Sequence, residues 1–176
     1  LFLILFGYFV YLSLNRPADV DEGFFLAMGK SIYTNGRTIY LDFFSPQMPL
    51  LPYLYGFIMS IFGYSWAVAR IFTAFFTAFI GWLLCGYSLR RTGSKTFAAS
   101  VGLVYCFSPF IFIWLTCARV SALATFFLVT SIFLLPPLSP RSSRFYYVLS
   151  GILVGLSINT RLYILAAAPA IAFHVF

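Results

Sequence analysis

Charged residues are scarce in this chain: only 9% of its 176 residues are Asp, Glu, Lys or Arg, against about 25% in an ordinary soluble domain. Acidic residues are the scarcest, with four against eleven Lys and Arg. This composition excludes a soluble globular domain. It also excludes a disordered chain, which combines low hydrophobicity with high net charge. The basic residues are scattered between apolar runs, so we expect no nucleic acid as a partner.

Metal ligands and reactive side chains are also few. The chain has one histidine, His174, to which we assign no role, and three cysteines inside apolar stretches: Cys85, Cys106 and Cys117. An odd set of embedded cysteines does not build a disulfide framework, so we expect small hydrophobic side chains there. The sequence holds no glycine-rich phosphate loop, metal-ligand cluster or nucleophile elbow, so the residues themselves predict no cofactor.

Hydrophobic residues dominate instead, at 62% of the chain, with 23 Phe and 12 Tyr and a mean hydropathy of +0.96. A transmembrane helix needs about 20 apolar residues, and the uncharged stretches run over 1–15, 43–69, 71–89, 96–118, 120–140, 145–160 and 162–176. They lack the strict alternation of membrane strands. The sequence therefore predicts an all-α polytopic membrane protein of about five or six spans, with one transmembrane domain over residues 1–176. Because the chain begins with Leu1 and ends within an apolar run, we expect the N-terminal part of a longer protein.

Two basic loops indicate the orientation. Arg90, Arg91 and Lys95 lie in the connection RRTGSK, and Arg141 and Arg144 lie in SPRSSRF, two spans later. Short loops rich in Lys and Arg remain in the cytoplasm. Residues 15–65 then form the first extracytoplasmic loop, and the link 116–121, which carries Arg119, faces the same outer side.

We expect two short helices at the membrane interface within this outer loop. One covers Glu22–Tyr33, where Phe24, Phe25 and Met28 recur at helical spacing. The other covers about 49–62, and a turn near Asn35–Gly36 joins them. In the spans, Ser108-Pro109 predicts a kink in the third, and the pattern Gly151-x-x-x-Gly155 predicts a close helix contact.

All four acidic residues lie in that single outer loop: Asp19, Asp21, Glu22 and Asp42. They could simply hydrate the loop, or one of them could be a catalytic carboxylate. Asp21 and Glu22 precede a predicted helix, whose positive N-terminus favours an ionised carboxylate able to act as a general base. An ion-coupled transporter normally carries acidic groups within its spans, and these spans have none.

The order of these features resembles the GT-C glycosyltransferases, above all the branch with the dolichyl-phosphate-mannose–protein mannosyltransferases and the bacterial aminoarabinose and Rgt-type sugar transferases. The matching segments are DVDEGFFLAMGKSIYTNGRTIYLDFFSPQMPLLPYLYGFIMSIFG, WAVARIFTAFF, CARVSALATFFLVTSIFLL and GILVGLSINTRLYIL. The resemblance implies an integral membrane enzyme of the plasma, inner or ER membrane. Its active site would face the extracytoplasmic side, and it would move a sugar from a polyprenyl-phosphate carrier to a lipid, glycan or protein.

The resemblance also implies roles for individual residues. Asp21 would be the general base for an inverting transfer, Glu22 would support the loop or the acceptor, and Asp42 would be a second outer-loop acid. Arg119 would meet the donor phosphate, with Arg70 and Arg161 as further candidates for that phosphate. Some members use a divalent cation, so the metal requirement stays open.

This chain departs from the family pattern at two places. Many relatives have Lys-Pro-Pro where it has Gln47-Met48-Pro49, and many have Asp where it has Ser121. Two alternatives therefore stay open: a helical transporter or permease whose acidic loop is merely hydrated, and a non-catalytic GT-C relative. Arg70 could also simply anchor a helix end by snorkelling.

Overall fold

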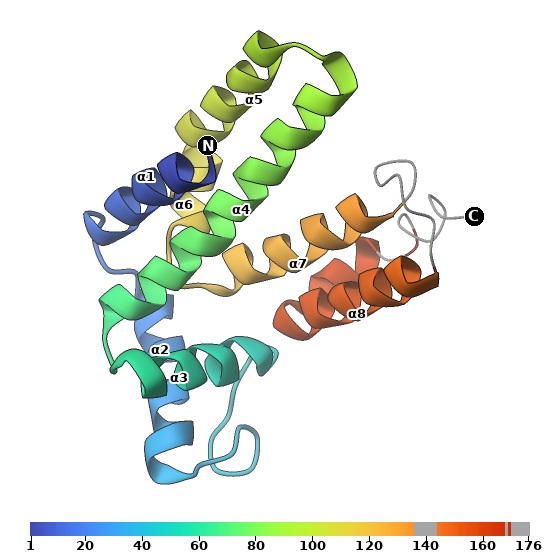
Figure 1. Cartoon of the computed structure of the whole chain (residues 1–176). Helices are drawn as coiled ribbons and strands as arrows, with labels where there is room; N and C mark the ends of the chain where they lie inside the picture. The colour runs from blue at the N-terminus through green and yellow to red at the C-terminus, as the bar shows by residue number, and fades with distance from the viewer. Residues whose placement is uncertain (136–143, 168, 170–176) are drawn as a thin grey trace.

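The computed structural model describes residues 1–135, 144–167 and 169, and the regular elements of this part of the chain are helices (Figure 1). Only an isolated bridge between Ile39 and Phe43 has β geometry there. The elements are α1 (Phe2–Leu14), α2 (Val20–Asn35), α3 (Leu50–Phe62), α4 (Trp66–Thr92), α5 (Lys95–Phe107), α6 (Pro109–Leu115), α7 (Val120–Leu134), α8 (Arg144–Thr160) and the 3-10 helix η1 (Leu162–Ala167). The all-α class expected from the sequence is confirmed for the described residues.

Helix α4 is the longest element, and local signals fix both of its ends. At its start the Ser65 hydroxyl accepts a hydrogen bond from the N–H of Ala67, as N-cap serines do. At its end Gly93 adopts a φ of 67°, a left-handed conformation that glycine tolerates best. Arg90 and Arg91 occupy the last turn, where cations interact favourably with the helix dipole. With 27 residues, α4 is about 40 Å long.

Among the helices that the structure describes, α4 alone is long and apolar enough to cross a membrane by itself, so the expected five or six spans stay a prediction. Helices α5 and α6 pass the same test together but are bent by 56°, and the bend falls between Phe107 and Pro109, where the kink was expected. The apolar helices α1, α3 and α7 are shorter, at 13, 13 and 15 residues.

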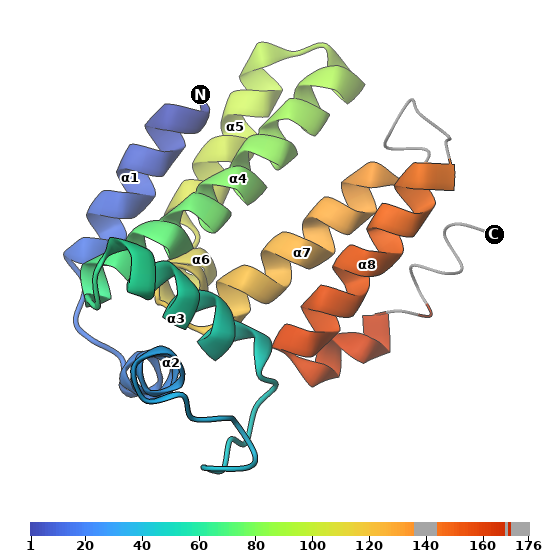
Figure 2. The same cartoon turned by 60° about the horizontal axis from the view of Figure 1, so that its bottom comes forward.

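Helix α4 packs against α1 and α5 and also against α7. Figure 2 shows α1 and α5 beside one flank of α4 and the α7–α8 pair on the other, with α2 and α3 across one end. One hydrophobic core lies where α2, α3, α4 and α7 meet, around Phe25, Leu51 and Leu123. The other lies between α1, α4 and α5, around Phe9 and Ile80.

Residues 15–65, predicted to form the outer loop, contain the two helices expected there. Helix α2 begins two residues before the predicted Glu22, and Gly36 ends it with a φ of 63°. The two helices cross at glycines: a Cβ atom on Gly56 would lie 2.5 Å from the carbonyl oxygen of Gly29. No side chain larger than hydrogen fits there. That both helices lie at a membrane interface stays a prediction.

The predictions for the part of the chain after residue 140 have different outcomes. A Cβ atom on Gly151 or Gly155 would meet no heavy atom within 4 Å, so the expected close helix contact is wrong within the described residues. Arg141, His174 and most of the final apolar run lie outside those residues. The described beginning of that run is the 3-10 helix η1, which follows a break at Arg161.

Candidate functional site

The acidic segment forms the N-terminus of α2. Asp19 is the N-cap residue, and its side chain accepts a hydrogen bond from the N–H of Asp21 at 3.0 Å. The backbone N–H of Asp19 donates in return to Oε2 of Glu22 at 3.0 Å. This reciprocal arrangement is a capping box, which satisfies N–H groups that the first helical turn leaves unpaired. The capping box therefore fixes the backbone that carries Asp21 and Glu22.

The Glu22 carboxylate is fully buried and joins three separate parts of the chain. Arg70 of α4 donates to it through Nε at 3.1 Å and through Nη2 at 2.6 Å. The N–H of Ala118, in the link between α6 and α7, donates to Oε1 at 2.6 Å. With the Asp19 bond, the two oxygens accept four hydrogen bonds, so Glu22 holds α2, α4 and the 116–119 link together.

These hydrogen bonds also determine the ionisation of Glu22. Burial raises the pKa of the carboxyl, but the hydrogen bonds from Arg70, Ala118 and Asp19 outweigh burial and hold the pKa below its ordinary value. Glu22 therefore stays ionised at neutral pH. With a side chain 0% exposed, it has no surface for an acceptor substrate in this structure.

The Arg70 guanidinium donates to Glu22 and to backbone carbonyls at the end of α1 and in the connection that follows it. Besides Glu22, it donates through Nη1 to the carbonyls of Ser13 and Arg16 at 2.9 and 3.0 Å, and through Nη2 to that of Pro17 at 3.1 Å. Its side chain is only 7% exposed. The arrangement ties the α1–α2 connection to α4 and leaves no donor aimed outward at a phosphate.

Arg119 lies on the outer side of this buried cluster and pairs with the two remaining acids of α2. It forms ion pairs with Asp19, at 3.3 Å, and with Asp21, and its guanidinium lies 5.0 Å from the centroid of the Trp114 ring. The Asp21 side chain is 47% exposed. Asp21 is therefore the most accessible carboxylate of this cluster, since the Asp19 side chain is 29% exposed.

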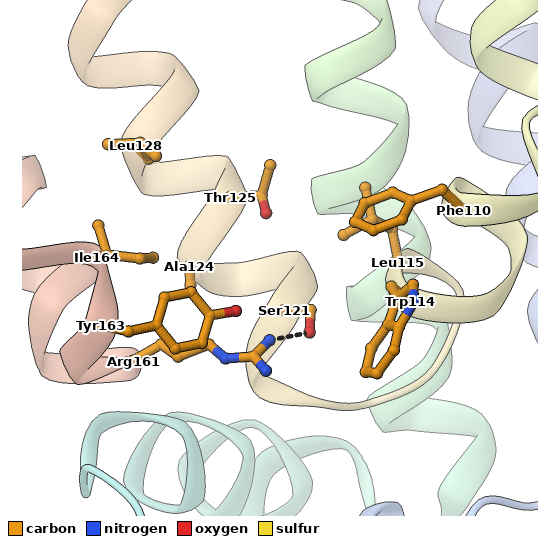
Figure 3. Close-up of a pocket in the computed structure, with 10 residues that line it drawn as sticks. All are labelled: Phe110, Trp114, Leu115, Ser121, Ala124, Thr125, Leu128, Arg161, Tyr163 and Ile164. Atoms are coloured by element: carbon orange, nitrogen blue, oxygen red, sulfur yellow. Dashed lines mark hydrogen bonds between the residues drawn. The ribbon is translucent and has the colours of Figure 1, made fainter. Parts of the chain in front are cut away.

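A cavity of about 330 Å³ opens next to Trp114, between α6, α7 and η1 (Figure 3). Arg161 lies in its wall, donates to the Ser121 hydroxyl at 2.6 Å and stacks 4.3 Å from the Tyr163 ring centroid. None of the four acidic side chains of the chain, all of which are described, forms an ion pair with Arg161. The lining residues are Phe110, Trp114, Leu115, Ser121, Ala124, Thr125, Leu128, Arg161, Tyr163 and Ile164.

Arg161 thus places an uncompensated positive charge in a mostly apolar cavity. A phosphate group would fit this environment, since guanidinium groups bind phosphate oxygens through two parallel hydrogen bonds. The Ser121 hydroxyl, which accepts a hydrogen bond from Arg161, is neutral and leaves the charge of Arg161 available.

Asp42 lies apart from the other acids. It is exposed and accepts a hydrogen bond from the N–H of Thr38 at 2.6 Å, within its own loop. Asp21 is in the first turn of α2, whose 16 residues extend about 24 Å, and Asp42 follows the other end. The structure therefore brings together Asp21, Glu22, Arg70 and Arg119 and leaves Asp42 outside this group.

Arg16 is a structural residue that no sequence pattern indicated. Its Nη1 donates to the carbonyl of Phe112 at 2.7 Å and to the Thr116 hydroxyl at 2.8 Å. Carbonyls at the last turn of a helix have no partner within the helix, so Arg16 closes the end of α6. Its partners are about a hundred residues away in the chain, and no local pattern could have indicated them.

Among the described residues, no group of three or more His, Cys, Asp or Glu side chains could hold a metal ion. No protein-family model, curated protein or solved structure matches this chain. The candidate site therefore rests on its own geometry.

Proposed function

We propose that this chain belongs to a polytopic membrane glycosyltransferase of the GT-C type, which transfers a sugar from a polyprenyl-phosphate carrier to a lipid, glycan or protein acceptor. One observation carries the proposal. The accessible carboxylate of Asp21 is held by Arg119, which stacks on Trp114, and Trp114 forms a wall of the cavity that contains Arg161. A base and a cationic cavity thus lie at the same end of the bundle.

The distribution of charge supports a membrane placement. Arg70 lies at the end of α4 that contacts Glu22, and Arg90 lies at the end next to the RRTGSK turn. The 20 positions from Arg70 to Arg90 correspond to about 30 Å of helix. The hydrocarbon core of a bilayer is also about 30 Å thick. We propose that α4, α5 with α6, α7 and α8 cross the bilayer and that α1 is the outer part of a further span. The RRTGSK turn then lies in the cytoplasm, and α2 and α3 lie at the outer interface.

In the proposed reaction, Asp21 accepts the proton of an acceptor hydroxyl as its oxygen attacks the anomeric carbon. The bond from that carbon to the carrier phosphate breaks, and the phosphate leaves with the electron pair. Because the oxygen attacks the face opposite the phosphate, the anomeric configuration inverts. Arg161 stabilises the negative charge that develops on the leaving phosphate. Arg119 orients the base, and Glu22 and Arg70 fix the backbone that carries Asp21 and Arg119.

The test is sugar transfer from polyprenyl-phosphate sugars in membranes that carry the full-length protein. We expect Asp21→Asn at matched expression to lower the rate about 10²-fold or more, as the loss of a general base does. Arg161→Gln should raise the KM for the donor and lower kcat. Asp42→Asn is the matched control, because its carboxylate is bonded within its own loop.

Each contrary outcome has a definite meaning. Full activity in Asp21→Asn together with loss in Asp42→Asn would move the base to the second acid. A wild-type protein that transfers no sugar from any such donor would contradict the enzyme and favour a transporter or a non-catalytic relative.

A further inference from the structure

A second cavity lies away from the candidate site. It is an open groove of about 690 Å³ between α1, α4 and α5, three helices that lie side by side in Figure 2. Its walls are almost wholly apolar and include Ile4, Trp82, Leu103 and Phe107. The Tyr8 hydroxyl in the wall already donates to the Cys106 carbonyl at 3.1 Å. The groove therefore favours a long hydrocarbon group.

One end of the groove is basic. Lys95, in the first turn of α5, is the only charged side chain among its lining residues. Arg90 and Arg91 lie a few residues before it, in the last turn of α4. None of these cations forms an ion pair in the described structure, because every acidic residue belongs to the segment 19–42.

The groove has the length of one lipid chain in a bilayer leaflet. From Lys95 to Phe107, α5 rises by about 18 Å, and half of the hydrocarbon core is about 15 Å. A ligand seated with its anion at Lys95 would therefore end its apolar part near the bend between α5 and α6.

We infer that this groove binds an anionic glycerophospholipid, with an acyl chain along α4 and α5 and the phosphate at Lys95. The inference uses the proposed membrane placement but not the sugar-transfer reaction. The basic end distinguishes this occupant from a zwitterionic lipid, since each basic residue near the membrane surface favours anionic lipid. A protein segment packed over the groove would leave no space for a lipid chain and is the competing outcome.

Trp82 provides the probe, because it lies in the groove wall. The full chain, with Trp66→Phe and Trp114→Phe to isolate the Trp82 fluorescence, is reconstituted in phosphatidylcholine vesicles. Phosphatidylglycerol or phosphatidylcholine with brominated acyl chains is then added as quencher. We expect half-maximal quenching by the anionic lipid at about a fivefold lower mole fraction.

Two pairs of variants distinguish the effect of the Lys95 charge on lipid binding from the effect of the open space in the groove. Lys95→Gln should abolish the anionic preference, and Arg144→Gln, which removes a charge at an exposed position outside the groove, should keep it. Gly86→Leu should narrow the groove, because Gly86 lines it and a Cβ atom there has open space within 4 Å. It should reduce quenching by the anionic lipid to the level of phosphatidylcholine, whereas Gly151→Leu, at a position with the same open space but outside the groove, should not.

Three results would overturn the inference. Equal quenching of the wild type by both lipids would remove the role of Lys95, and unchanged preference in Gly86→Leu would place the lipid elsewhere. Absence of quenching by either lipid would mean that protein covers the groove. Asp21→Asn should leave the lipid preference intact, so a failed sugar transferase and a failed lipid site give different results.

Discussion

Asp21 and Glu22 are adjacent in the sequence and lie in opposite environments. Asp21 points to the surface and pairs with Arg119, whereas Glu22 is enclosed and receives four hydrogen bonds. Successive residues of a helix lie about 100° apart, so one side chain of such a pair can face solvent while the next faces the core. The structure thus divides the acidic pair into one accessible carboxylate and one that holds the fold together.

The buried partnership between Glu22 and Arg70 predicts a large effect on stability. Glu22→Gln should lower the free energy of unfolding by about 3–5 kcal/mol, because it leaves the Arg70 guanidinium buried without a counter-charge. Thermal unfolding of the purified protein in detergent measures the loss. Asp42→Asn, at an exposed position, should change stability by no more than about 0.5 kcal/mol.

The stability difference between the wild type and Glu22→Gln should depend on pH. Since the pKa of Glu22 is lowered in the folded state, its contribution is complete above the unfolded value of about 4.3 and is lost as the pH falls through the folded pKa. The difference in Tm between the wild type and Glu22→Gln should therefore shrink below about pH 4.3. A difference that stays constant down to pH 3 would contradict the assignment.

At the scale of the elements, the crossing of α2 and α3 fixes how these two helices lie at the end of the bundle that holds the acidic residues. The backbones approach so closely at Gly29 and Gly56 that only hydrogen fits between them. The contact holds α3 against the helix that carries Asp21, while Tyr55 of α3 bonds to Thr73 of α4 at 2.7 Å. The position of α2 therefore depends on two glycines that carry no chemistry.

Gly56→Ala tests this crossing. The added methyl group would overlap the Gly29 carbonyl, so we expect a loss of about 1–3 kcal/mol in unfolding free energy, as overpacking typically costs. Gly151→Ala makes the same change on an open face of α8 and should be neutral or stabilising by up to about 1 kcal/mol. Equal Tm values for the two variants would argue against the crossing.

At the scale of the whole molecule, α4 separates an end that holds all four acidic residues from an end whose charged residues are all basic. The acids, Arg119 and the cavity with Arg161 lie toward the start of α4, and the turn with Arg90, Arg91 and Lys95 lies at its other end. Figure 2 shows α2 and α3 at one end of the bundle and the α4–α5 turn at the opposite end. In a membrane this arrangement places the candidate site on one side and the basic turn on the other.

This arrangement predicts the labelling of single cysteines in intact cells. A membrane-impermeant maleimide should modify Leu41→Cys, in the exposed loop after α2, and should reach Arg91→Cys only after the cells are permeabilised. The same accessibility at both positions before permeabilisation would show that α4 does not cross the membrane.

The sequence by itself determined the helical class, the two helices within residues 15–65, the bend at Pro109 and the grouping of all acids in one segment. These properties follow from local composition: apolar runs, serine and aspartate caps, glycine at helix ends, and proline at the bend. Only the tertiary structure decided which charged residues meet. Glu22 bonds to Arg70 and Ala118 across 48 and 96 residues of chain, and Arg161 meets Ser121 in the cavity wall. Such contacts depend on how helices pack, and packing is set by side-chain shapes summed over the whole core, which no local pattern records.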